Sequence, residues 1–159
     1  MHTKLSAAAA LVVAAAVATG AAMGGHATAQ QRIAITSPGS IDSGVFVLTP
    51  LTSGPIGRDS GTRTWCCWTR HFSERDGQAI ETDSPVLETF KGKHGTFVWR
   101  AQVVWIDLDK NYSIGTGTWK ILRGSGAYAH LEGHGRMTFV NANEQNVADR
   151  AEGLVDLGR

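Results

Sequence analysis

The fold is decided by the stretch SIGTGTWKILRGSGAYAHLEGHGRMTF, residues 113–139. Aromatic and branched residues alternate in it with glycines, which are typical of places where a backbone bends or approaches another strand closely. Gly115 and Gly117 share one strand face with Trp119 and Ile121, as is usual in a strongly bent barrel wall. The stretch therefore predicts a strand, a glycine-rich corner and a second strand.

The preceding segment, Thr96 to Asp107, has the clearest strand pattern in the chain. A mixed face alternates there with a continuously apolar face, which carries Phe97, Trp99, Ala101, Val103 and Trp105. Alternation with a period of two is typical of a strand that buries one face. We therefore expect the apolar face to point into the protein core.

Shorter strand patterns complete the expected fold. They cover residues 44–48, 63–72, 78–82, 85–90 and 146–155, and Asp76-Gly77 predicts a hairpin turn between the second and the third. Helical periodicity is absent after the first 29 residues. Seven or eight short strands separated by turns predict an all-β protein. A single closed antiparallel barrel is favoured because closure leaves no exposed sheet edge.

The N-terminus predicts export. Lys4 precedes the apolar stretch Leu5–Ala22, and Ala27-Thr28-Ala29 has the small-x-small pattern of a signal-peptidase site. The alternative is a membrane anchor, but the stretch is rich in weakly apolar Ala and borderline for the about 20 residues that a span needs. We expect residues 1–29 to be a signal peptide cleaved after Ala29, with no integral membrane segment left. The mature protein is then secreted, or held in the periplasm or cell envelope.

The remaining chain of about 130 residues suits one domain with its own core. We expect residues 30–62 to form an N-terminal extension with the first strand, and residues 63–159 to form the rest of the barrel. The whole chain has 15 Lys and Arg against 14 Asp and Glu, and one Lys belongs to the leader. A neutral chain without a basic run gives no electrostatic basis for binding nucleic acid or anionic membranes.

The two cysteines, Cys66 and Cys67, are adjacent in the chain. Neighbouring Cα atoms lie about 3.8 Å apart, closer than the about 4.4–6.8 Å of ordinary disulfides. In an oxidising compartment the pair can form a vicinal disulfide. The alternative is two thiols on opposite faces of a strand.

No metal site and no cofactor are expected. His130 and His134 flank Glu132, a spacing that suggests metal ligands on a helix. Gly133 and Gly135 instead indicate a bend and the start of a strand. The sequence contains no nucleophile motif and no phosphate-binding loop.

Glu88 is the candidate catalytic residue, because it lies between Val86 and Phe90 on one strand face. Desolvation inside a barrel would raise the pKa of its carboxyl, which could then serve as an acid or base. The alternatives are that this face points outward, or that an arginine pairs with the carboxylate. Asp149 has a similar place on the last strand.

Tryptophans are the candidate ligand-binding residues. Trp99, Trp105 and Trp119 are each expected to pack in the core, where a large aromatic side chain buries about 150–250 Å². The alternative is that some of them line a cavity for one apolar ligand, as in other small barrels. Tyr128 would then place its hydroxyl at the barrel mouth, or else pack in the glycine corner.

Two motifs within the stretch, Gly117-Thr-Trp119 and RGSGAYAHLEG at residues 123–133, resemble the allene oxide cyclase and dirigent barrel superfamily. The chain is most similar to small secreted bacterial members of that group. The resemblance implies an eight-stranded, calycin-like antiparallel barrel with an apolar interior. In plant members the interior binds a fatty-acid epoxide or phenolic radicals, and dimers and trimers are common. The acidic residues of the cyclase and dirigent sites have no matching motif in this chain.

The expected function is therefore a secreted barrel, monomeric or a homo-oligomer, that binds a small apolar or aromatic ligand without catalysis. One alternative is an isomerase or cyclase of allene oxide cyclase type acting on a lipid-like or phenolic substrate. A pKa-shifted carboxyl inside a sizeable pocket would favour it. The other alternative is a structural exported protein, which a filled interior without a cavity would favour.

Overall fold

The computed structural model describes residues 30–109, 111–143 and 146–158, and within them it contains nine strands and no helix. No helix long and apolar enough to cross a membrane is therefore found in the described part of the chain. The expected signal peptide lies outside the described residues. The strands are β1 (Gln31–Gly39), β2 (Ser43–Pro50), β3 (Asp59–Cys66), β4 (Thr69–Arg75), β5 (Gln78–Gly92), β6 (Gly95–Asp109), β7 (Tyr112–Gly126), β8 (Leu131–Ala142) and β9 (Val147–Leu157).

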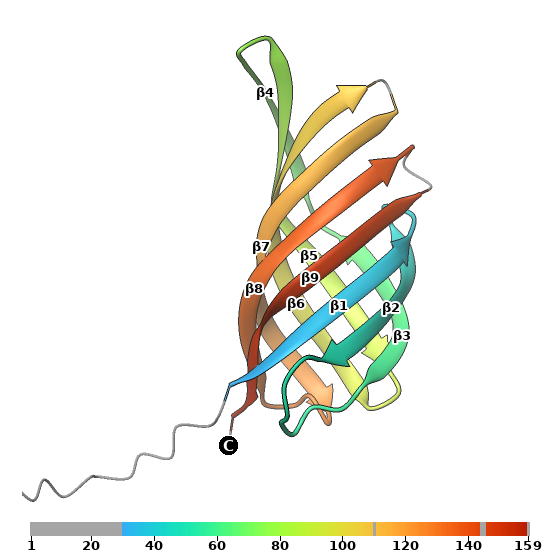
Figure 1. Cartoon of the computed structure of the whole chain (residues 1–159), viewed down its shortest axis with the longest axis vertical. Helices are drawn as coiled ribbons and strands as arrows, with labels where there is room; N and C mark the ends of the chain where they lie inside the picture. The colour runs from blue at the N-terminus through green and yellow to red at the C-terminus, as the bar shows by residue number, and fades with distance from the viewer. Residues whose placement is uncertain (1–29, 110, 144–145, 159) are drawn as a thin grey trace, which may run out of the picture.

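Eight of these strands form a closed antiparallel barrel (Figure 1). Their order is β3-β2-β1-β9-β8-β7-β6-β5, and β3 pairs back onto β5 to close the ring. The expected class of fold is thus confirmed: an all-β protein built around one eight-stranded antiparallel barrel. Closure pairs both edges of every barrel strand along part of its length, so no strand of the ring is an edge strand throughout.

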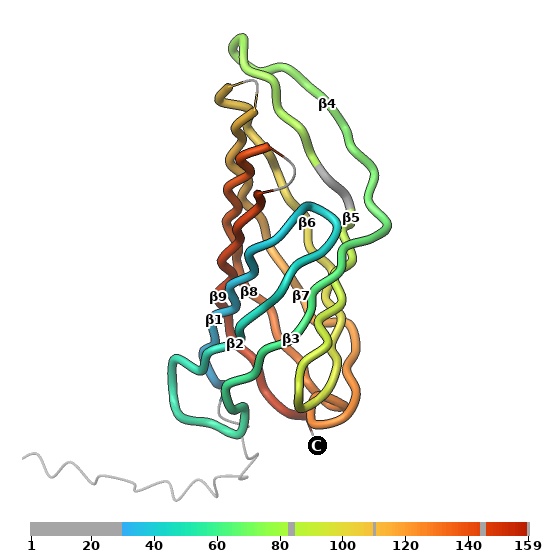
Figure 2. The backbone as a smooth tube through the Cα atoms, turned by 90° about the vertical axis from the view of Figure 1, so that its right-hand side faces the viewer, coloured from blue at the N-terminus to red at the C-terminus, as the bar shows by residue number. Residues whose placement is uncertain are grey.

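The ninth strand, β4, stands outside the ring. The first half of β5 pairs with β4 and its second half pairs with β3. The turn between β4 and β5 contains Asp76 and Gly77 with φ of 54° and 78°, which confirms the expected hairpin. This hairpin projects past the neighbouring strands at the end of the barrel away from the C-terminus (Figures 1 and 2). We call that end the mouth and the opposite end the closed end.

Three expected strand boundaries are wrong. Residues 63–72 are not one strand, because β3 ends at Cys66 and β4 begins at Thr69. Conversely, residues 78–82 and 85–90 belong to the single strand β5, whose register with β6 shifts between Asp83 and Val86. Residues 30–62 form β1, β2 and the start of β3 rather than one strand. This segment is therefore part of the barrel.

The apolar face expected on β6 is confirmed as an inward face, since its five members are at most 4% exposed. Trp99 stacks on Trp119 of β7 with 4.9 Å between ring centroids. A Cβ atom at Gly115 would lie 2.8 Å from Trp105, so only glycine leaves room for that indole. Aromatic side chains therefore fill the middle of the barrel between its two ends.

Hydrogen bonds from the β2–β3 connection and the β5–β6 turn seal the closed end. The Gln31 amide donates to the carbonyl of Ile56 and accepts from its N–H, each at 2.9 Å. The Tyr128 hydroxyl donates to Asp59 at 2.8 Å, and the N–H of Lys93 donates to the same carboxylate at 2.9 Å. Burial raises the pKa of Asp59, but these hydrogen bonds outweigh it and hold the pKa below its ordinary value. Burial of Tyr128 raises the pKa of its own hydroxyl, and the hydrogen bond to the Asp59 carboxylate raises it further.

Candidate functional site

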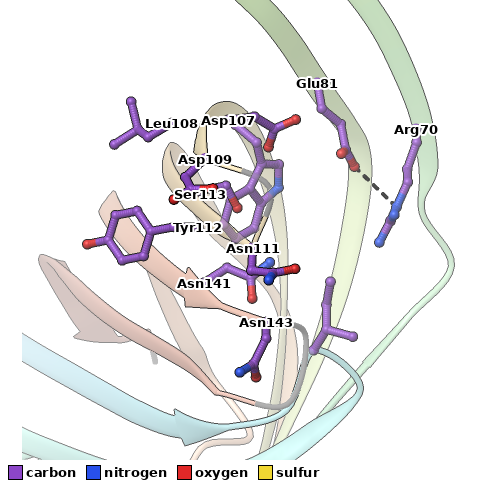
Figure 3. Close-up of a pocket in the computed structure, with 12 residues that line it drawn as sticks. Arg70, Glu81, Asp107, Leu108, Asp109, Asn111, Tyr112, Ser113, Asn141 and Asn143 are labelled. Carbon is purple, nitrogen blue, oxygen red and sulfur yellow. Dashed lines mark ion pairs between the residues drawn. The ribbon is translucent and has the colours of Figure 1, made fainter.

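A pocket of about 760 Å³ opens at the mouth of the barrel (Figure 3). Its floor includes the indole of Trp105, which is 4% exposed, and the partly buried side chain of Ile41. Both residues lie near strand ends: Trp105 precedes the β6–β7 turn and Ile41 lies in the β1–β2 turn. The pocket therefore lies where the aromatic core of the barrel ends.

Two walls of different character face each other above this floor. On the projecting hairpin, the Nε of Arg70 lies 3.1 Å from a carboxylate oxygen of Glu81. On the other side, Asp107 points across the pocket toward this ion pair, with Ser113 and Asn141 nearby (Figure 3). Polar groups thus ring the pocket while an aromatic ring closes its base.

Below the mouth, three charged side chains meet inside the barrel. The guanidinium of Arg63 lies 3.5 Å from Glu88 and 3.7 Å from Asp149, and all three side chains are at most 1% exposed. The guanidinium also donates to the carbonyl of Ser40 at 3.2 Å and lies 4.8 Å from the ring centroid of Trp65. We call Arg63, Glu88 and Asp149 the charge cluster.

The strand alternation explains how these charges come to face inward. Arg63 is two residues before the buried Trp65 on β3, and Glu88 is two residues before the buried Phe90 on β5. Side chains two residues apart share a strand face. The register also places Glu88 directly opposite Trp65 on one neighbouring strand and opposite Trp99 on the other. Arg63 and Glu88 therefore point inward because they share a strand face with buried aromatic residues.

The charge cluster holds one positive group against two carboxyls. Burial raises the pKa of Glu88 to about 8, repulsion from Asp149 adds to this, and attraction to Arg63 opposes it. Burial also raises the pKa of Asp149 to about 6, although Arg63 and Ser37 lower it. Near neutral pH, Glu88 therefore keeps its proton while Asp149 pairs with Arg63. The indole N–H groups of Trp65 and Trp99 also lower the pKa of Glu88, although neither has a hydrogen-bond partner within ordinary limits among the described residues.

A chain of aromatic contacts runs from the mouth pocket to the charge cluster. The ring centroid of Phe139 lies 5.1 Å from that of Trp105 and 5.4 Å from that of Trp65. Trp65 in turn contacts the guanidinium of Arg63. Glu88 does not line the mouth pocket. A molecule in the pocket would therefore contact Trp105, but not the candidate acid.

The residues expected to bind a ligand divide between the two ends of the barrel. Trp105 lines the mouth pocket, whereas Trp99 and Trp119 stack on each other deeper in the core. Tyr128 is not at the mouth, because its hydroxyl is bound to Asp59 at the closed end. Its place agrees with the expected packing in the glycine corner.

Cys66 and Cys67 form a vicinal disulfide, with Cα atoms 3.7 Å apart, in the connection between β3 and β4. Cys67 has a φ of 66°, which is uncommon for a residue with a side chain. This conformation turns the chain between the barrel wall and the projecting hairpin. The disulfide therefore lies where the strand expected over residues 63–72 is interrupted.

Arg63, Arg70 and Glu81 are functional candidates that the sequence patterns did not indicate. The only signal for Arg63 is its position two residues before Trp65, which places it on the inward face. Arg70 and Glu81 face each other only because β4 and β5 pair as a hairpin. Their separation in the sequence does not by itself indicate that the two side chains meet.

The histidines expected to lie at a bend are far from the mouth. His130 and His134 border a groove of about 670 Å³ toward the closed end, together with Lys120 and Glu132. Across the described residues, no group of three or more His, Cys, Asp and Glu side chains is arranged to hold a metal ion. The groove thus combines basic and acidic side chains on the outside of the barrel.

Comparison of this chain with known protein families, with curated proteins and with solved structures finds no match.

Proposed function

We propose that this protein is an exported β-barrel that binds a small apolar or aromatic molecule at its mouth, against Trp105. The observation that carries the proposal is the mouth pocket itself, about 760 Å³ in volume above an aromatic floor. Pockets for small molecules typically measure about 300–1,000 Å³ and combine apolar surface with a few polar groups. The volume lies within that range, and the lining combines the apolar side chains of Trp105 and Ile41 with a larger number of polar groups.

The rest of the barrel supports binding at the mouth rather than in the interior. The closed end is sealed by hydrogen bonds to Gln31 and Asp59. The middle is filled by buried aromatic side chains, and Phe46, Phe90, Phe97 and Trp99 are all 0% exposed. Among the described core aromatics, Trp105 is the one that lines the mouth pocket, so a ligand of the expected kind reaches the edge of the aromatic core there.

The resemblance of residues 113–139 to the allene oxide cyclase and dirigent superfamily supports a second candidate, an isomerase or cyclase. The specific observation in its favour is Glu88, whose raised pKa leaves a carboxylic acid protonated near neutral pH. A general acid must come within hydrogen-bond reach of its substrate. Because Glu88 does not line the pocket, binding without catalysis is the better supported function.

Export belongs to the same proposal. Residues 1–29 have the sequence of a cleaved signal peptide. Disulfides form and persist mainly in oxidising compartments, and Cys66 and Cys67 form one. We place the working protein outside the cytoplasm, where small molecules from the environment reach the mouth directly.

Calorimetric titration of the mature protein with 2-phenylethanol tests the proposed function. Trp105→Leu removes the aromatic floor and should abolish binding, whereas Trp119→Leu should leave binding intact. The pair is matched, because the two tryptophans are 4% and 2% exposed and both variants lose a buried indole. Equal loss of binding in both variants would show a general effect of instability. Binding that survives in Trp105→Leu would contradict a site at the mouth.

Native mass spectrometry of protein purified from its own producer tests whether a ligand is retained. A bound molecule with an aromatic or apolar skeleton would support the binding function. A ligand-free mass, together with no response to phenolic or fatty-acid probes, would favour the structural alternative, in which a filled barrel acts through its outer surface.

A further inference from the structure

Strand β4 has one paired edge and one free edge. It is the last strand in the order of the sheet, and among the described strands it pairs with β5 alone. Every residue of Thr69–Arg75 is exposed, and β4 lies at the outside of the projecting hairpin (Figures 1 and 2). The backbone N–H and C=O groups of a free edge can pair with another strand, so this edge is a place for association.

The middle of β4 carries an uncovered aromatic ring. Phe72 is 70% exposed, more than any other large hydrophobic side chain among the described residues. A single exposed apolar side chain is ordinary on a protein surface. Here, however, it lies at the midpoint of the free strand, with residues 69–71 on one side and residues 73–75 on the other. The strand is therefore symmetric in length about its one large apolar residue.

Charges of opposite sign flank Phe72 on the same strand face. Arg70 lies two residues before it and Glu74 two residues after it, and such positions share a face. Arg70 contacts Glu81 through its Nε, but its side chain is 38% exposed and its guanidinium has further N–H donors. Glu74 is exposed and belongs to no ion pair among the described residues. A second, antiparallel β4 would therefore present the opposite order of charges.

We infer that two copies of this chain pair through the free edges of their β4 strands, antiparallel and in register about Phe72. In that register all seven residues of each strand are paired. Phe72 meets Phe72 of the second copy, Arg70 meets its Glu74, and Glu74 meets its Arg70. Aromatic pairs and opposite charges placed directly across from each other stabilise an antiparallel sheet. Both copies use the same surface, as in a closed two-fold dimer.

The sequence of β4 favours this one register. A shift of two residues in either direction is the smallest that keeps the side chains of paired residues on the same face. Such a shift leaves two residues of each strand unpaired, sets Phe72 opposite Arg70 or Glu74, and breaks both charge pairs. Because β4 is complementary to itself in charge and in length, the partner that it fits is a second copy rather than a strand of another protein.

Sedimentation velocity of the mature protein measures the association. A seven-residue edge buries little surface, so we expect a weak dimer with a dissociation constant on the order of 0.1 mM. Between about 10 µM and about 1 mM, the average mass should rise from that of a monomer toward that of a dimer. Amide hydrogen exchange in β4 should slow over the same range of concentration, because its free N–H groups become paired.

Two charge reversals test the register. Glu74→Lys alone and Arg70→Glu alone each set like charges opposite each other at both pairs, so each should weaken self-association at least about tenfold. Mixing the two variants restores an opposite charge at both positions, and the mixture should form a heterodimer about as strong as the wild-type dimer. Glu132→Lys is the control, because it reverses an exposed charge near the closed end. It should associate like the wild type.

Each outcome supports or overturns the inference. A wild type that stays monomeric at about 1 mM overturns it, and so does a dimer that both β4 variants still form, because that dimer uses another face. If both variants are folded by circular dichroism but do not associate on mixing, the charges do not pair and the register is wrong. If Arg70→Glu does not fold, Glu74→Lys alone decides, since Glu74 is exposed and belongs to no ion pair among the described residues.

Discussion

Glu88→Gln should stabilise the protein, although it changes a fully buried side chain of an ion cluster. Glutamine has nearly the shape of the protonated acid that the structure favours at this position, because the pKa of Glu88 is raised to about 8. The substitution leaves Arg63 paired with Asp149 alone, at 3.7 Å. The cluster then holds one positive and one negative charge, and the excess buried carboxyl is gone.

The magnitude follows from the difference in pKa between the folded and the unfolded protein. An unfolded Glu88 releases its proton near the ordinary value of 4.5, whereas the folded protein keeps it until about pH 8. The raised pKa means that the wild type loses stability as the pH rises between these two values. At about 1.4 kcal/mol per pH unit, the loss amounts to roughly 3 kcal/mol at pH 7 and roughly 5 kcal/mol above pH 8, as upper values. The amide of the Glu88→Gln variant has no proton to lose in this range.

Urea unfolding of both proteins at pH 4, pH 7 and pH 9 measures this effect. The two free energies of unfolding should agree within about 1 kcal/mol at pH 4 and diverge in favour of Glu88→Gln as the pH rises. Glu132→Gln, at an exposed position, should follow the wild type at every pH. Parallel pH profiles for wild type and Glu88→Gln would refute the reasoning. A variant less stable than the wild type at pH 7 would show that Arg63 needs the charge of Glu88.

Three further predictions concern the core, the closed end and the disulfide. Trp99→Ala should lower the free energy of unfolding by about 3–5 kcal/mol, because Trp99 is 0% exposed; a loss below about 1 kcal/mol in urea would place this side chain outside the barrel. Tyr128→Phe should cost about 1–2 kcal/mol in the same assay, because it removes the donor to Asp59, whereas Tyr112→Phe at a 39% exposed position should cost nothing measurable. The intact mass of the mature protein should lie about 2 Da below that of the dithiol if Cys66 and Cys67 are bonded; alkylation of two thiols under oxidising conditions would contradict that bond.

The strands that the sequence predicts best are those with one inward and one outward face. β6 is an example, because Phe97, Trp99 and Trp105 belong to a continuously apolar face that alternates with a mixed face. The glycines of β7 are informative for the same reason, since Gly115 is the direct cross-strand partner of Trp105 and leaves room for its ring. Local alternation is sufficient to predict a strand where the two faces of the sheet lie in different environments.

β1 was not predicted, because its sequence combines two opposing signals. Ile33 and Ile35 alternate as in a strand, but Pro38 and the neighbouring serine and glycine residues indicate a loop. In the barrel, β1 pairs along its length with β9 and also with β2, and these pairings override the local tendency. Long-range pairing of this kind has no signature within a short window of sequence.

The charge cluster shows the same limit for the site. The sequence places Glu88 and Asp149 among apolar neighbours and leaves open whether they face inward. It does not reveal that Arg63 reaches both of them, since the three residues come from β3, β5 and β9. The mouth pocket is likewise formed by turns and a hairpin far apart in the chain. Closure of the barrel brings the residues that line the pocket together, and no local sequence pattern predicts this.

The central claim, a ligand site at the mouth against Trp105, is tested most directly by the indole N–H resonances of the five tryptophans in an ¹H–¹⁵N spectrum. Single Trp→Phe variants assign them. On titration with 2-phenylethanol, the Trp105 resonance should move most, while those of Trp99 and Trp119 stay in place. Larger shifts at Trp99 and Trp119 would locate the ligand inside the barrel, and no shift at any of the five would contradict a binding function at the mouth.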